Sequence, residues 1–119
     1  MIKNKIIDKT YVINLNKRKD RWNDINNNFK NTSLKLTRWE AVYGKKLKDS
    51  EIGGITTSKC YYCCSPSMIG IWQSHYKLWE HIVKNKEDNV LILEDDSCPI
   101  NDSFEKDLVK YWNNVPDNW

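Results

Sequence analysis

The residues of this sequence that are best suited to chemistry form the acidic run Glu94–Asp95–Asp96. It directly follows Val90–Leu93, four consecutive apolar residues that predict a strand covered on both faces. Adjacent carboxylates repel one another in a partly buried crevice, and a divalent cation removes that repulsion. In an extended segment Glu94 and Asp96 point the same way, and two oxygen donors suit Mg²⁺ or Mn²⁺. Such a metal can stabilise a diphosphate leaving group. The alternative interpretation is a solvated acidic loop.

Basic and imidazole side chains offer further candidates. Arg18 and Arg21 lie one turn apart at a predicted helix start, where they form either a solvated basic face or a contact with phosphate or ribose, helped by the helix N-terminus. His75 lies within an apolar helical stripe. This placement favours a core histidine whose ring nitrogens are satisfied locally, and a role beside a ligand stays open.

Three of the four cysteines, Cys60, Cys63 and Cys64, lie close together and include one C-x₂-C spacing. Structural zinc needs four ligands, so Cys98 or His75 would have to complete the site. Only one pair has the C-x₂-C spacing that is typical of zinc knuckles, and the pattern therefore favours reduced thiols over zinc.

These candidate residues are positioned by alternating strands and helices. Short apolar runs predict strands at 10–15, 36–42 and 89–94, and residues 45–64, with Gly53–Gly54, favour a loop. Helices are predicted at 17–30, at 66–85 and from 102 to near 116. This order predicts an α/β domain with a parallel sheet, in which ligands bind beyond the carboxyl ends of the strands.

Capping residues and apolar spacing define the predicted helices. Asn16, Ser65 and Asp102 are the predicted N-caps, with Pro66 in the first turn after Ser65 and Glu105 completing a capping box with Asp102. The long helix has a continuous apolar stripe, which we expect to pack across the sheet. Its members are Met68, Ile71, Trp72, His75, Leu78, Trp79 and Ile82.

Composition narrows the classes of function. The length of 119 residues suits one domain, and the apolar fraction of 39% supports a folded core. The net charge of +3 comes from scattered lysines, with no basic cluster interleaved with aromatics, so a nucleic-acid partner is not expected. Met1–Thr10 has four charged residues and does not resemble a signal peptide, and no run is long enough to span a membrane. We therefore expect a cytoplasmic protein.

Three blocks of sequence occur in an order that is specific to one family. They are YVINLNKRKDRW (Tyr11–Trp22), LTRWEAVYG (Leu36–Gly44), and SMIGIWQSHYKLWEHIV followed by LILEDD. Together they resemble the N-terminal part of glycosyltransferase family 25, the lipooligosaccharide and procollagen galactosyltransferase group. The resemblance covers nearly the whole chain.

The resemblance implies a GT-A fold, which is a Rossmann-like domain that transfers a sugar from a nucleotide donor. The implied activity is metal-assisted transfer of a hexose, galactose or glucose, from a UDP-sugar to a glycan or protein acceptor. Glu94 and Asp96 match the Mn²⁺ or Mg²⁺ ligands, and Asp95 belongs to the same donor-diphosphate motif. The other matching residues are Asn14, Arg18, Asp20 and Arg21 in the first block, Arg38 and Glu40 in the second, and Gly70, Ser74 and His75 in the helix.

The sequence departs from the family pattern in two places. Ile71 stands where the family usually has a Cys, and the sequence stops at VPDNW, where the family continues into a further strand. We therefore expect a partial, truncated domain over residues 1–119, after the third strand and its following helix. An open sheet edge in such a domain predicts self-association. The alternative function is a catalytically inactive nucleotide-sugar-binding module.

Overall fold

The computed structural model describes residues 6–118 of the chain. The prediction that Met1–Thr10 is not a signal peptide concerns a segment that lies partly outside the described residues, and Trp119 also lies outside them. Within residues 6–118, no helix is long and apolar enough to cross a bilayer.

A three-stranded parallel sheet forms the centre of the structure. Its strands are β1 (Lys9–Asn14), β2 (Leu36–Glu40) and β3 (Val90–Glu94), in the order β2-β1-β3. Asn14 pairs with Glu40 on one side of β1, and Ile13 pairs with Glu94 on the other. The parallel α/β sheet that the sequence predicts is confirmed, and all three strands end at the same edge.

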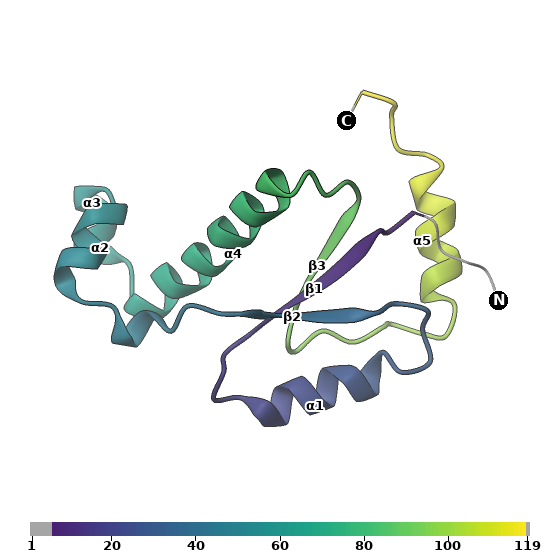
Figure 1. Ribbon diagram of the computed structural model, residues 1–119, viewed down its shortest axis with the longest axis horizontal. Helices are drawn as coiled ribbons and strands as arrows, with labels where there is room; N and C mark the ends of the chain where they lie inside the picture. Colours follow the sequence, from purple (N-terminus) through teal and green to yellow (C-terminus); the bar gives the residue numbers. More distant parts are fainter. Residues whose placement is uncertain (1–5, 119) are drawn as a thin grey trace.

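Helices cover both faces of this sheet (Figure 1). On one face, Tyr11 and Ile13 pack with Leu78 of α4. On the other face, Val12 packs with Ile25 of α1, and Phe104 of α5 packs against the same cluster. The three helices are α1 (Lys19–Asn28), α4 (Pro66–Lys84) and α5 (Phe104–Trp112). The alternation of β1 side chains thus supplies two separate apolar cores.

The predicted N-cap of α4 is confirmed, and the other two predicted caps are wrong. The Ser65 hydroxyl accepts a hydrogen bond from the Met68 N–H at 3.2 Å. Helix α1 begins after Arg18 rather than Asn16, and α5 begins after Ser103 rather than Asp102. The Asn16 side chain has another use, because its Oδ1 accepts from the Arg38 guanidinium at 3.3 Å.

The predicted capping box at α5 is also wrong. The Glu105 carboxylate accepts a hydrogen bond from the Ser33 N–H at 3.0 Å and so ties α5 to the loop before β2. The Asn101 side chain accepts from the Ser103 N–H at 3.0 Å. A tertiary contact has therefore replaced the local cap that the sequence spacing favours.

The face of α4 that packs on the sheet differs from the predicted stripe. Trp72 and Trp79 are 48% and 50% exposed, so the prediction that they pack across the sheet is wrong. The buried residues of α4 are Ile69, Gly70, Gln73, Ser74 and Leu78. Small residues at 70 and 74 let the helix approach the chain after β2 closely, which turns the large aromatics outward. Self-association through an open sheet edge stays a prediction, which sedimentation would test.

Residues 45–64 fold into short helices, so the predicted loop is wrong there. They form a 3-10 turn at Gly44–Lys46, then α2 (Asp49–Ile55) and α3 (Ser58–Cys63). Local caps explain them, since the Glu51 carboxylate accepts from the Lys48 N–H at 2.7 Å and the Thr57 hydroxyl from the Cys60 N–H at 3.2 Å. The two helices project beyond the sheet next to the start of α4 (Figure 1).

Candidate functional site

A pocket of about 270 Å³ lies at the carboxyl ends of the strands. This is the edge at which parallel α/β sheets bind ligands. The lining combines apolar, cationic and acidic side chains from β1, α1, α4 and the segments after β2 and β3. It consists of Ile13, Leu15, Arg18, Arg21, Ala41, Val42, Tyr43, Gly44, Ser67, Ile71, Ser74, His75, Glu94, Asp95 and Asp96.

Asn14 lies beneath the pocket and connects all three strand ends. Its side chain is buried, with 1% exposed. Its Nδ2 donates to the Asp95 carboxylate at 2.8 Å and to the Arg18 carbonyl oxygen at 3.0 Å. Its Oδ1 accepts from Arg38 Nε at 2.8 Å. Asn14 therefore positions other groups and does not line the pocket, in contrast to the substrate contact that the family resemblance implies.

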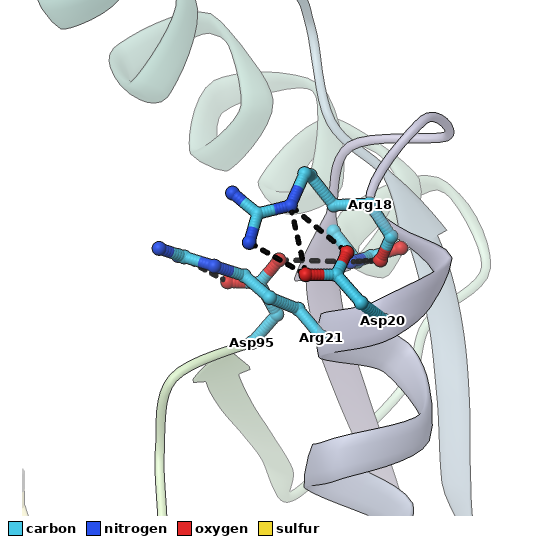
Figure 2. A network of polar contacts seen from close by, with 5 residues as sticks. Arg18, Asp20, Arg21 and Asp95 are labelled. Atoms are coloured by element: carbon cyan, nitrogen blue, oxygen red, sulfur yellow. Dashed lines mark hydrogen bonds and ion pairs between the residues drawn. The ribbon is translucent and has the colours of Figure 1, made fainter.

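Asp95 is the acidic residue that is held most firmly. Arg21 Nη1 lies 3.2 Å from Asp95 Oδ1, and Asn14 donates to the other carboxylate oxygen. Figure 2 shows Arg21 reaching from the first turns of α1 to Asp95 after the end of β3. The Asp95 side chain is only 13% exposed. Both oxygens of Asp95 are therefore engaged within the protein. Glu94 and Asp96, which are exposed, are the carboxylates of the run that remain accessible to a ligand.

Arg18 is also paired at the pocket rim. Its Nη2 and Nε donate to the two oxygens of Asp20 at 2.7 and 2.9 Å, as Figure 2 shows. The hydrogen bond from Arg18 lowers the pKa of Asp20 to about 2. The Arg18 side chain remains 40% exposed, so part of its guanidinium can still reach a ligand in the pocket.

His75 lies at the pocket and not in the apolar core, which overturns the core interpretation. Its side chain is 27% exposed, and its Nε2 lies 3.4 Å from Glu94 Oε1. Glu94 itself is 56% exposed. The two side chains come from α4 and β3, so their contact depends on how the helix docks on the sheet.

Ser74 and two glycines hold α4 against the chain that follows β2. The Ser74 hydroxyl donates to the Gly70 carbonyl oxygen at 2.7 Å and accepts from the Val42 N–H at 2.8 Å. A Cβ added at Gly70 would lie 2.6 Å from the Gly44 nitrogen, and one at Gly44 would lie 1.7 Å from the Pro66 carbonyl oxygen. Ser74 and Gly70 therefore shape the pocket wall by permitting this close approach.

The acidic run has a different geometry from the extended one expected. Strand β3 ends at Glu94, and Asp95 and Asp96 lie in a turn. Within residues 6–118, no three His, Cys, Asp or Glu side chains gather closely enough to hold a metal ion. Cys60, Cys63 and Cys64 therefore do not form a three-ligand cluster within these residues.

Arg38 and Glu40 lie outside the pocket lining, whereas Tyr43, which was not among the predicted site residues, belongs to it. Arg38 lies behind Asn14, and Glu40 is exposed at the end of β2. Tyr43 lines the pocket, and the Lys17 ammonium lies 3.9 Å from its ring centre. The position of Tyr43 directly before Gly44, in the second sequence block, is the signal that could have identified it.

This fold places a pocket at the carboxyl ends of a parallel sheet, which is the edge where α/β proteins of this class bind ligands. The family model for glycosyltransferase family 25 (LPS biosynthesis protein) matches residues 7–119. The chain therefore belongs to glycosyltransferase family 25.

Individual relatives agree with this assignment. A glycosyltransferase 25 family member of Aedes aegypti is 34% identical over 94 residues, which are 72% of this chain and 16% of that protein. Procollagen galactosyltransferase 2 of Homo sapiens is 28% identical over 116 residues, which are 91% of this chain and 18% of the relative. The chain thus spans less than one fifth of the length of these two relatives.

Proposed function

We propose that this chain binds the nucleotide-sugar donor of a metal-assisted hexosyltransferase with a GT-A arrangement. The pocket at the strand ends is the observation that carries the proposal, because arginines and carboxylates from separate elements line it together. The donor is a UDP-sugar, with galactose favoured because the human relative is a procollagen galactosyltransferase. The acceptor is a glycan or a protein.

The cationic residues would bind the donor diphosphate. Arg18 and Arg21 both line the pocket and are 40% and 43% exposed. Guanidinium groups form charge-assisted hydrogen bonds with phosphate oxygens. Arg21 also holds Asp95, so one side chain would orient the acidic run and contact the ligand.

Glu94 and Asp96, which both line the pocket, are the carboxylates that would hold a divalent cation. Glu94 and Asp96 would supply one oxygen each, and diphosphate oxygens and water would complete the set, as Mg²⁺ commonly requires. When bound, the metal would neutralise charge on the leaving diphosphate. His75, in contact with Glu94, would limit the directions that this carboxylate can take.

Calorimetry of UDP with Mn²⁺ and with a chelator tests the proposal. Binding linkage is reciprocal, so Mn²⁺ and UDP should each tighten the other. We expect Asp96→Asn to weaken the Mn²⁺-dependent affinity by about tenfold, or about 1.4 kcal/mol. Asp102→Asn is the matched control, because it removes the same charge from an exposed residue outside the pocket lining. Equal affinity with metal and with chelator, in a folded chain, would refute the metal assignment.

Turnover separates the enzyme from the binding module. UDP release from UDP-galactose in the presence of Mn²⁺ and acceptor glycan would establish transfer or donor hydrolysis. Metal-coupled UDP binding without release would instead identify the chain as a catalytically inactive nucleotide-sugar-binding module. Asp96→Asn should reduce release as well as binding if the pocket performs the chemistry.

A further inference from the structure

A pair of thiols lies outside the proposed donor site, where α3 meets α4. The Sγ atoms of Cys60 and Cys64 are 2.6 Å apart, with the Cys60 thiol donating to the Cys64 sulfur. The Cys64 N–H donates to the Cys60 carbonyl oxygen at 2.8 Å. This one-turn backbone contact places residues four apart on the same helix face. Cys63 falls on another face and is exposed.

The thiol pair opens into its own pocket of about 330 Å³. The pocket is mainly apolar, and Met68, Ile69 and Trp72 of α4 form one wall. Cys60 and Cys64 are both partly exposed. A small reagent can therefore reach the thiols, while the surrounding side chains keep them together.

We propose that Cys60 and Cys64 form a redox modification site, which closes to an intramolecular disulfide by exchange with a low-molecular-weight disulfide such as oxidised glutathione. The Cys64 thiolate attacks one sulfur of the reagent, forms a mixed disulfide and releases one thiolate. Cys60 then loses its proton and attacks the Cys64 sulfur, which releases the second thiolate. The reagent is reduced to two thiols as the protein dithiol is oxidised.

The geometry assigns different roles to the two cysteines. The Cys60 thiol donates a hydrogen bond to the Cys64 sulfur, and this contact and burial both raise the pKa of Cys60. Since the thiolate is the attacking species in exchange, the raised pKa of Cys60 favours Cys60 as the resolving thiol, which acts after the reagent has reacted at Cys64. Residues four apart on one turn also come within the Cα separation that a disulfide requires.

The small ring makes this disulfide readily reversible. A bridge that encloses only Tyr61, Tyr62 and Cys63 removes little conformational entropy from the unfolded chain, so it stabilises the fold less than a long-range bridge. Disulfides found in reducing compartments are mostly transient ones of this kind. The proposed modification is therefore compatible with the cytoplasmic location expected from the sequence.

The pair lies where a bond would affect the wall of the donor pocket. Cys64 immediately precedes Ser65, whose hydroxyl caps α4, and Pro66 in the first turn touches Gly44. Ser67 and Ile71 of the same helix line the donor pocket. A Cys60–Cys64 disulfide would fix the entry into this helix, and its formation does not depend on the nucleotide-binding proposal.

Thiol trapping in defined glutathione mixtures tests the proposal. Every protein carries Cys98→Ser to remove the exposed thiol outside the α3–α4 junction. After equilibration, free thiols are alkylated and the products are identified by intact and peptide mass spectrometry. The starting protein should lose the Cys60 and Cys64 thiols together, keep Cys63 alkylatable, and recover both thiols on reduction.

Three single variants give the matched comparison. Cys63→Ser should form the same internal disulfide at the same glutathione ratio as the starting protein. Cys60→Ser should stop at a mixed disulfide on Cys64, and Cys64→Ser should form no disulfide to Cys60. The proposal is overturned if Cys63→Ser abolishes the internal bond. It is equally overturned if the starting protein retains three alkylatable thiols across the whole glutathione range.

Discussion

Replacing the buried amide of Asn14 should destabilise the whole domain and the proposed site together. Asn14→Leu has nearly the same size and cannot form the three side-chain hydrogen bonds to Arg18, Arg38 and Asp95. Two of these partners are charged, and hydrogen bonds to charged groups contribute about 1.5–3 kcal/mol each, against about 1 kcal/mol for a neutral partner. The gross loss is therefore roughly 4–7 kcal/mol.

Interactions that survive the substitution reduce this loss in the free energy of unfolding. Asp95 keeps its ion pair with Arg21, Arg38 keeps its contact with Asn16, and the leucine side chain adds apolar burial. We expect a net loss of about 3 kcal/mol in the free energy of unfolding, since the unpaired groups are only partly rehydrated. At about 4 °C per kcal/mol for a domain of this size, the melting temperature should fall by about 12 °C.

Urea unfolding monitored by circular dichroism measures this change, and Asn16→Leu is the matched control. Asn16 is exposed and also contacts Arg38, so its replacement should cost less than about 0.5 kcal/mol. A loss of similar size for both variants would refute the reasoning. Asn14→Asp gives a second check, because its carboxylate would face Asp95 and the two would share a proton. Its destabilisation should therefore be greater at pH 7 than at pH 5.

Three further predictions concern the packing of α4 and the pH response. Gly44→Ala should destabilise by more than about 2 kcal/mol in urea titrations, because its Cβ would lie 1.7 Å from the Pro66 carbonyl oxygen. Gly54→Ala meets nothing within 4 Å and should be neutral or stabilising. Leu78→Ala removes a side chain that is 0% exposed and should cost about 3 kcal/mol. Burial opposes ionisation of Glu87, but hydrogen bonds from Lys9 and Tyr11 prevail and lower its pKa below the ordinary 4.5. The ionised Glu87 carboxylate therefore stabilises the fold above pH 4.5, and this stabilisation is lost as the pH falls below that value. In Glu87→Gln, the free energy of unfolding should depend less steeply on pH below 4.5. An unchanged pH dependence would show that the carboxylate does not contribute.

Local sequence patterns predicted the central architecture well. Four consecutive apolar residues identified β3, and the Ser65–Pro66 start identified α4. Both patterns involve only residues that are neighbours in the chain, so they can be read without knowing the tertiary structure. The short helices α2 and α3 were missed because Gly53–Gly54 suggested a loop. The caps that stabilise these helices, at Glu51 and Thr57, are short-range contacts that the sequence interpretation did not consider.

The orientation of α4 required tertiary information. Apolar spacing identified a stripe, but the close contact between Gly70 and Gly44 decides which side of the helix faces inward. The same limit applies to the pocket. The acidic run was located from its position after a strand, whereas the engagement of Asp95 by Asn14 and Arg21 depends on β1 and β3 being neighbours. That pairing is a property of the sheet and has no local signature.

The position of β1 between β2 and β3 also sets an order of events during folding. Strand β1 can pair with β2 through a connection that contains only α1, whereas Asn14 and Asp95 are 81 residues apart in the chain. Contacts with a large sequence separation form slowly, because closing the intervening loop costs entropy before any contact compensates for it. During synthesis on the ribosome, β1, α1 and β2 can thus associate while Asp95 is still unmade. The pocket is completed only when β3 docks, so a nascent chain that has formed its first two strands lacks the acidic wall of the pocket.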